Sequence, residues 1–375
     1  MTRAMNQPNV SLPGHRLEAL DGLRLVAALS VALFHFGFLG ATIDYTRMSL
    51  PAAESVLKYG YLGVPLFFVI SGFVIAYSAE GRTPVQFAIA RFARIYPTFV
   101  ICMTATFLVV LAFGAPFLQT DLAQWAANLI VKPELLGQKA MDGSYWSIFY
   151  EAVFYGWVVL LMALGAFRRE RYPAIVLLWL LISVLDRAFL SSKILRYLLL
   201  TDESAFFCAG LLLYAAFRDG YTRRILALLA LAAAVAVYQS LDLLHWNRAN
   251  YHVDYSDLVT AIATIAVIAI VAAAIRLPRL PLPSGVTLAI GGLTYPFYLL
   301  HQHIGYVAFN RLGDALPPAA LLAAVTLVLL LLSALVWRFV ERPAQDWTKA
   351  TLSGWAGARA LLPANGARPH PGIAN

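Results

Sequence analysis

Long uninterrupted apolar stretches constrain this chain more than any other feature of its sequence. A bilayer core about 30 Å thick is crossed by a helix of roughly 20 apolar residues. About ten such stretches occur, near residues 20–40, 60–79, 97–117, 145–167, 173–190, 196–217, 225–241, 257–275, 286–309 and 319–340. They are continuously apolar and do not alternate as membrane-spanning strands do. The sequence therefore predicts an all-α, polytopic membrane helical bundle with about ten transmembrane helices.

Composition and charge support the same interpretation. The chain is 61% hydrophobic and only 13% charged, which excludes an ordinary soluble protein. Lys and Arg concentrate in alternate loops, and the positive-inside rule then predicts both termini in the cytoplasm. The net charge of +8 is explained by this topology, so we expect the lipid bilayer and no nucleic acid as partner. We expect a protein of the inner or plasma membrane whose chain crosses the bilayer several times.

The expected domain organisation is simple. Residues 1–19 form a cytoplasmic tail, residues 20–346 the transmembrane domain, and residues 347–375 a disordered cytoplasmic tail rich in Pro, Gly and Ala. Cys102 and Cys208 fall inside predicted helices, with no CxxC pattern and no histidines at metal-ligand spacing. We therefore expect neither a disulfide nor a metal site.

The first apolar stretch, DGLRLVAALSVALFHF, carries Arg24 near one end and His35 near the other. Eleven residues are about three helical turns, so both lie on one face, about 16 Å apart along the axis, with Asp21 near that face. Between them, the same face carries only small or medium residues, which are Ala27, Ala28 and Val31. This pattern predicts a groove. The alternatives are a snorkelling arginine and a histidine that only ties two helices together.

Two later stretches add ionisable residues inside spans. In GSYWSIFYEAVFY, Ser147, Glu151 and Tyr155 share a helix face. In LTYPFYLLHQHIG, His301 and His303 point in roughly opposite directions. Their depth puts Glu151 and one of these histidines in the same half of the bilayer as the first-helix histidine. The alternative is a hydrogen-bonded cluster with a purely structural role.

A basic pair precedes the third stretch. In FAIARFARIYP, Arg91 and Arg94 lie one turn apart, and we expect Pro97 to mark the turn into the membrane. Two guanidinium groups at that spacing suit a polyphosphate, although positive-inside charge explains them equally. The second stretch, GYLGVPLFFVISGFVIAYS, offers the Ser71 hydroxyl and three glycines that permit close helix or ligand approach, which are Gly60, Gly63 and Gly72.

Taken in order, these segments resemble the acyltransferase 3 family of integral-membrane acyltransferases. The resemblance rests on LDGLRLVAALSVALFHF, GYLGVPLFFVISGF, RFARIYP, WSIFYEAVFY, YPFYLLHQ and VERPAQ, from residue 20 to about residue 346. It implies transfer of an acyl group, with acetyl as the expected one, from acyl-CoA to a hydroxyl. The implied acceptor is a sugar of a cell-surface polysaccharide, lipopolysaccharide, glycolipid or related metabolite. The family's required arginine and histidine correspond to Arg24 and His35, and its RxxR pair to Arg91 and Arg94.

Two departures from the family pattern limit which of the family's residue roles and domains we expect in this chain. Pro65 stands where many relatives have a polar residue, so that position receives no role. Some relatives carry a C-terminal esterase-like domain, whereas only about 30 residues follow VERPAQ here. We therefore expect the stand-alone form, which completes the transfer itself or passes the acyl group to a biosynthetic partner protein.

The residues suggest a mechanism. His35 would act as general base, or as a nucleophile through an acyl-imidazole, and Glu151 would orient it as a second catalytic residue. The predicted donor-binding residues are Arg24, Arg91, Arg94 and Ser71. The predicted substrate-binding residues are Trp146, Tyr155, His301 and Asp21. The rival functions are a secondary transporter with an intramembrane His/Glu proton relay and a partner subunit without catalysis.

Overall fold

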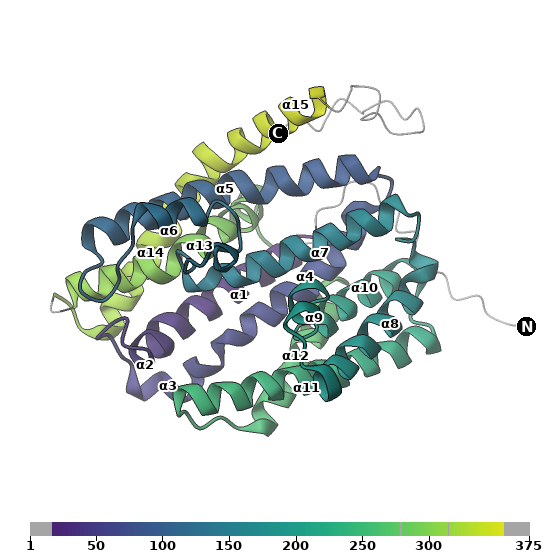
Figure 1. The fold of residues 1–375 in the computed structure, drawn as a ribbon, viewed down its shortest axis with the longest axis horizontal. Helices are drawn as coiled ribbons and strands as arrows, with labels where there is room; N and C mark the ends of the chain where they lie inside the picture. The colour runs from purple at the N-terminus through teal and green to yellow at the C-terminus, as the bar shows by residue number, and fades with distance from the viewer. Residues whose placement is uncertain (1–16, 278–279, 314, 356–375) are drawn as a thin grey trace, which may run out of the picture.

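The computed structural model describes residues 17–277, 280–313 and 315–355, and every regular element in these residues is helical. Figure 1 shows long, roughly aligned helices, with short helices and loops between some of them. The α-helices are α1 (Glu18–Phe34), α2 (Gly40–Thr42), α3 (Glu54–Leu57), α4 (Gly63–Ala79), α5 (Pro84–Phe113), α6 (Leu122–Ala127), α7 (Trp146–Ala163), α8 (Tyr172–Leu185), α9 (Lys193–Leu198), α10 (Ser204–Asp219), α11 (Arg223–Tyr251), α12 (Asp257–Ala274), α13 (Ser284–Leu312), α14 (Pro318–Val336) and α15 (Arg342–Trp355). The predicted polytopic helical bundle is confirmed.

Eight helical segments of the described residues are long and apolar enough to cross a membrane. They are Glu18–Thr42, Pro51–Ala79, Pro84–Phe113, Gly143–Ala163, Arg169–Leu190, Arg223–Tyr251, Asp257–Ala274 and Pro318–Gly354. The other two predicted stretches form α10, which has only 16 residues, and α13, which carries many polar side chains. Both helices are largely buried in the bundle. Because neighbouring helices shield them from lipid, they do not need a strongly apolar surface.

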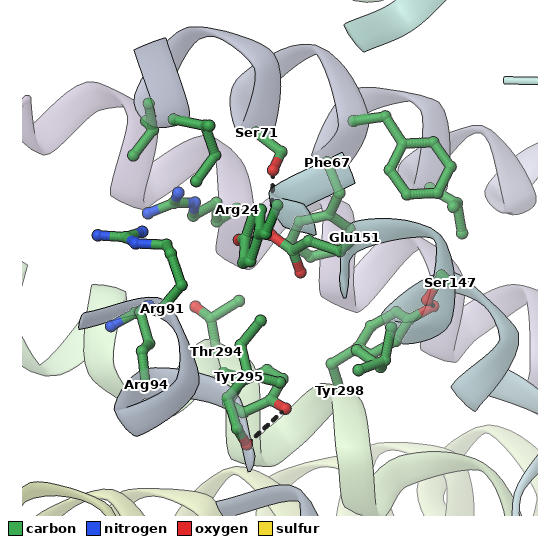
Figure 2. A pocket seen from close by; sticks show the side chains of 17 residues that line it. Arg24, Phe67, Ser71, Arg91, Arg94, Ser147, Glu151, Thr294, Tyr295 and Tyr298 are labelled. Carbon is green, nitrogen blue, oxygen red and sulfur yellow. Dashed lines mark hydrogen bonds between the residues drawn. The ribbon is translucent and has the colours of Figure 1, made fainter. Parts of the chain in front are cut away.

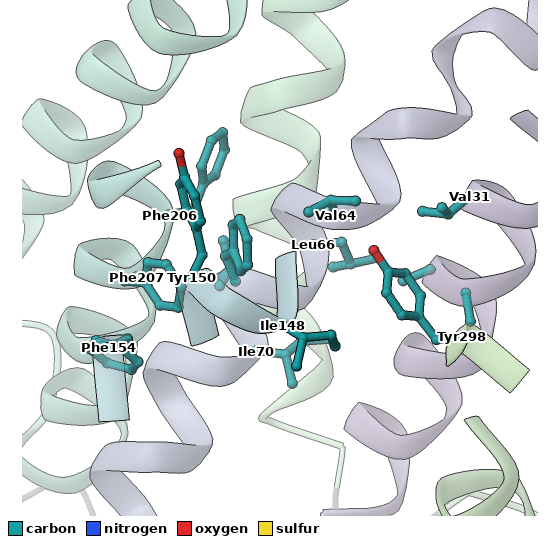
Figure 3. Packing of buried hydrophobic residues seen from close by; sticks show 14 of the residues in the cluster. Val31, Val64, Leu66, Ile70, Ile148, Tyr150, Phe154, Phe206, Phe207 and Tyr298 are labelled. Atoms are coloured by element: carbon teal, nitrogen blue, oxygen red, sulfur yellow. The ribbon is translucent and has the colours of Figure 1, made fainter. Parts of the chain in front are cut away.

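The centre of the bundle is built on close contact between α4 and α10. A Cβ atom at Gly72 would clash with the backbone oxygen of Phe207, and one at Gly210 would clash with the backbone oxygen of Val69. The two backbones therefore approach as closely as small residues allow, which is how membrane helices gain packing energy. Aromatic rings fill the space beside this contact, as Figure 3 shows, and the Phe154 and Phe207 ring centroids lie 4.4 Å apart.

The predicted groove on α1 is absent, because α4 occupies it. A Cβ atom at Gly63 would clash with the backbone oxygen of Ala27 and lie 2.8 Å from Val31, so α4 packs directly on this face. Ala27, Ala28 and Val31 are all buried, at 0%, 0% and 1% exposure. The prediction of an open groove along these residues is wrong. The glycines of α4 do permit close helix approach, as the sequence suggested.

α5 begins earlier than the apolar run indicated. The Thr83 side chain accepts a hydrogen bond from the backbone N–H of Gln86, and the Gln86 side chain accepts one from the Thr83 N–H, which forms a capping box. The helix therefore starts at Pro84 and continues through Pro97, which lies inside it. Pro97 is not the turn into the membrane, and the basic pair Arg91 and Arg94 sits on the helix itself.

The C-terminal helix α15 packs along α5, on the side of α5 away from most of the bundle (Figure 1). It follows a π-helical turn, Trp337–Glu341, at the end of α14. The helix includes residues 347–355, which the sequence assigned to a tail. The rest of that tail, and most of the N-terminal tail, lie outside the described residues.

Candidate active site

A cavity with about 800 Å³ of empty space opens between α1, α4, α5, α7 and α13. Its walls are largely apolar, and its polar lining contains seven of the residues singled out in the sequence, namely Arg24, Ser71, Arg91, Arg94, Ser147, Glu151 and Tyr155. Figure 2 shows Arg91 and Arg94 at one end, Ser147 and Tyr298 at the other, and Glu151 between them. Residues from five helices thus converge on a single space.

Glu151 holds the middle of this cavity. The Ser71 hydroxyl donates to its Oε1 over 3.0 Å, and the Tyr155 hydroxyl donates to the same oxygen. Among the described lining residues, Glu151 is the only carboxylate, and it faces three arginines. A charge buried in a membrane protein is costly unless opposite charges and hydrogen bonds compensate it. The carboxylate of Glu151 has two hydroxyl donors, and the arginines of the same cavity supply positive charge.

The arginines differ in their partners. Arg24 Nη1 lies 3.4 Å from Asp21 Oδ1, so Asp21 holds Arg24 in place without lining the cavity. The Arg91 guanidinium lies 5.6 Å from the Phe87 ring centroid and 6.0 Å from that of Tyr155. Within the described part of the chain, its Nε is buried without a hydrogen-bond partner, and neither Arg91 nor Arg94 forms an ion pair. These two cations can therefore accept an anionic ligand.

His35 and His301 form a buried pair between the π-helical turn His35–Leu39, which follows α1 directly, and α13. His35 Nδ1 lies 2.8 Å from His301 Nε2, and His301 Nδ1 lies 2.7 Å from the Tyr298 carbonyl oxygen. A carbonyl only accepts hydrogen bonds, so the proton of neutral His301 is on Nδ1 and its Nε2 accepts. The neutral His35 ring then donates through Nδ1. Its Nε2 is left with a free lone pair, the state that a general base requires.

His35 and Glu151 are not joined as the sequence suggested. The structure gives His35 the partner His301, and gives Glu151 the partners Ser71 and Tyr155. α1 packs mainly on α13 and α4, whereas α7 packs mainly on α5. Among the described residues, no hydrogen bond joins these two side chains, and the tautomer of His35 follows from the Tyr298 carbonyl acting through His301. A catalytic role for Glu151 stays a prediction.

Tyr298 connects the cavity to the histidine pair, and the sequence analysis did not assign it a role. Its hydroxyl lies 2.8 Å from the Ser147 hydroxyl in the cavity wall, while its backbone carbonyl holds His301. His35 and His301 themselves do not line the cavity. The signal that could have identified Tyr298 is its spacing of three residues from His301, which brings a backbone carbonyl beneath the ring.

Two residues at the start of α7 complete this end of the site. Asp142 is fully buried, accepts from the backbone N–H and hydroxyl of Ser144, and accepts from the His303 backbone N–H over 2.8 Å. Sequence reasoning missed it, although an Asp directly before a helix is a recognisable cap. Trp146 packs against Tyr150, with ring centroids 5.3 Å apart, and is 39% exposed. It does not line the cavity.

No cluster of three or more His, Cys, Asp or Glu side chains that could bind a metal occurs in residues 17–277, 280–313 and 315–355. The functional groups that the cavity does offer are cationic, hydroxylic and carboxylic. They suit recognition of an anionic organic ligand and, beside the histidine pair, proton transfer.

Comparison with known proteins gives this arrangement a family. Over 114 residues the chain is 39% identical to "Protein 2 in picA locus" of Rhizobium radiobacter, and the aligned region covers 28% of this chain and 52% of that protein. Over 104 residues it is 33% identical to "Acyltransferase MdmB" of Streptomyces mycarofaciens, which covers 28% of this chain and 26% of that protein. The matches thus span about half and about a quarter of these relatives. No solved structure matches the chain.

The family comparison is more extensive. The profile of the family described as "Acyltransferase domain" matches residues 17–338, which include the cavity, both histidines and all three arginines. This range also contains five of the six segments on which the resemblance was based, and the sixth, VERPAQ, begins two residues after the match ends. The match extends over well more than half of the sequence, and the chain belongs to the acyltransferase 3 family of integral-membrane acyltransferases.

Proposed function

We propose that this protein is an O-acyltransferase of the inner or plasma membrane that moves an acyl group from acyl-CoA to a hydroxyl of a cell-surface glycan or related glycolipid. One observation carries the proposal. A single cavity has two arginines without carboxylate partners at one end and, at the other, the tyrosine that holds the histidine pair. Family membership and a relative named as an acyltransferase support acyl transfer as the chemistry.

On the donor side, Arg91 and Arg94 bind the diphosphate of coenzyme A. Guanidinium groups bind phosphate oxygens bidentately, and these two lie one helical turn apart on α5. Arg24, held by Asp21, adds positive charge deeper in the cavity. Ser71 and Tyr155 position Glu151, whose negative charge keeps the three arginines from repelling one another.

On the acceptor side, His35 supplies the base. Its Nε2 takes the proton of the acceptor hydroxyl while that oxygen bonds to the thioester carbonyl carbon. The carbon–sulfur bond then breaks, and the leaving thiolate receives the proton from the His35 imidazolium. Trp146, half-exposed at the start of α7, offers a ring on which a sugar can stack. A separate biosynthetic protein that presents the glycan is a fitting partner.

The test is consumption of acyl-CoA by membrane vesicles that contain the protein. Wild type is compared with His35→Ala and with an Arg91→Gln/Arg94→Gln double variant, each given acetyl-CoA and a longer acyl-CoA. We expect His35→Ala to abolish turnover and keep donor binding, and the arginine variant to lose donor binding. His245→Ala is a control, because this histidine lies on α11, outside the cavity.

Two outcomes would contradict the proposal. Unchanged thioester consumption in His35→Ala would show that His35 is not the general base. An absence of acyl-CoA binding by wild type would show that acyl-CoA is not the donor. A labelled acyl group that stays on the protein, and disappears in His35→Ala, would instead indicate the acyl-imidazole route.

A further inference from the structure

An open groove adjoins the cavity on its arginine side. It has about 1180 Å³ of empty space and lies between the first turns of α5 and the helix α15. Its polar lining consists of Arg82, Gln86, Arg91, Arg94, Gln345, Lys349 and Ser353. Arg91 and Arg94 line both the groove and the inner cavity, so the two spaces meet at these arginines.

The wall of the groove is strongly basic. Four cations line it, and the described residues contribute no acidic side chain to its wall. None of the four forms an ion pair within the part of the chain that the structure describes. Four cations that line one groove repel one another, and a bound polyanion would relieve this repulsion.

The cations also have an order along the groove. Arg82 is exposed in the turn before α5, and Arg91 follows roughly 10 Å further along the helix axis, deeper in the protein. Lys349 reaches the same groove from α15. Coenzyme A has a matching order of groups, with a 3′-phosphate on the ribose at one end, the diphosphate next, and the thioester arm last.

We propose that this groove binds the nucleotide end of the donor, with Arg82 and Lys349 holding the 3′-phosphate and Arg91 and Arg94 holding the diphosphate. This inference rests on the proposed function and specifies its donor: the protein selects a 3′-phosphorylated coenzyme A thioester. The amide groups of Gln86 and Gln345 lie in the same groove and can hydrogen-bond the ribose or the base. The helix α15 is therefore a wall of the donor site.

The experiment compares acetyl-CoA with acetyl-dephospho-CoA, which lacks only the 3′-phosphate. KM and kcat are measured for wild type, Arg82→Gln, Lys349→Gln and the control Arg224→Gln, an exposed arginine on α11 outside the groove. We expect wild type to have a KM about tenfold to a hundredfold lower for acetyl-CoA. Arg82→Gln and Lys349→Gln should raise the KM for acetyl-CoA about tenfold, and leave kcat and the KM for acetyl-dephospho-CoA unchanged. Arg224→Gln should behave as wild type.

Three results would overturn the inference. Wild type could use both donors with equal KM, or the variants could raise both KM values equally. The third contradicting result concerns lipid: Arg82→Gln and Lys349→Gln leave both KM values unchanged. Their activity, unlike that of wild type, no longer depends on the phosphatidylglycerol content of vesicles made of phosphatidylcholine and phosphatidylglycerol. The groove would then bind a lipid phosphate.

A binding measurement separates this inference from the proposed function. The shift in melting temperature with coenzyme A and with dephospho-coenzyme A is recorded for the same four proteins, because a ligand that binds only the folded state stabilises it. If no thioester is consumed, the proposed function fails. The groove assignment then still stands if coenzyme A raises the melting temperature of wild type more than dephospho-coenzyme A does, and if Arg82→Gln and Lys349→Gln lose that difference. It fails if either condition is not met.

Discussion

At the scale of single residues, the tautomer of His35 depends on a backbone carbonyl that is connected to it through two successive hydrogen bonds. The Tyr298 carbonyl fixes the proton on His301 Nδ1, and His301 in turn orients His35. The sequence placed both histidines at a similar depth, but depth does not say which side chains meet. Because of this contact, we propose that His301, which the sequence predicted to bind substrate, positions His35.

We expect His301→Ala to lower kcat by about 10² to 10⁴-fold, the range that general-base catalysis supplies, with little effect on donor KM. His301→Gln should recover part of kcat, because the glutamine side-chain oxygen can accept a hydrogen bond from the Nδ1–H of His35. The measurement is kcat as a function of pH in both variants. His303→Gln is the control, since the ring of His303 contacts Tyr45 and Tyr306 instead. Equal losses in the alanine variant and this control would contradict the positioning role.

At the scale of helices, glycines decide how closely α4 meets its neighbours, and caps decide where helices begin. The glycines of α4 were recognisable in the sequence, but their contacts were not, because the partner backbones come from α1 and α10. The start of α5 was misjudged because the apolar run begins after Arg94. The capping box at Thr83 and Gln86 is a local signal that could have placed it.

We expect Gly72→Ala and Gly210→Ala each to destabilise the protein by about 1–3 kcal/mol, the usual effect of overpacking. The added methyl group would meet a backbone oxygen, which cannot rotate away as a side chain can. The melting temperature in detergent measures the effect. The matched control is Gly156→Ala, at an exposed position on α7 with open space around it. Its helix propensity should make it neutral or stabilising, and a similar loss there would argue against the backbone contact.

At the scale of the whole molecule, eight apolar segments and two buried helices account for the ten predicted stretches. α10 is apolar but has only 16 residues, which is short for a full span, whereas α13 is long but carries many polar side chains. Both helices are largely buried by other helices, so neither meets the length and hydropathy expected of a lipid-exposed span. The cytoplasmic placement of both termini stays a prediction from the charge of the loops.

Single cysteines test that placement. Lys139→Cys lies in the turn before α7 and Arg224→Cys near the start of α11, and both positions are exposed. The two native cysteines are buried, so they should react little. In intact cells, we expect a membrane-impermeant thiol reagent to label Lys139→Cys and to label Arg224→Cys only after permeabilisation. The reverse pattern would place both termini outside.

The sequence by itself determined the helical class, the family, the spacing of Arg24 and His35 in the first membrane segment, and the basic pair on α5. These are properties of local periodicity and composition, which a single helix expresses without its neighbours. Tertiary structure alone decided that Glu151 joins the arginines, that His35 pairs with His301, and that α4 fills the small-residue face of α1. Each of these depends on which helices are adjacent and how they are rotated, and residue positions along one helix do not specify either.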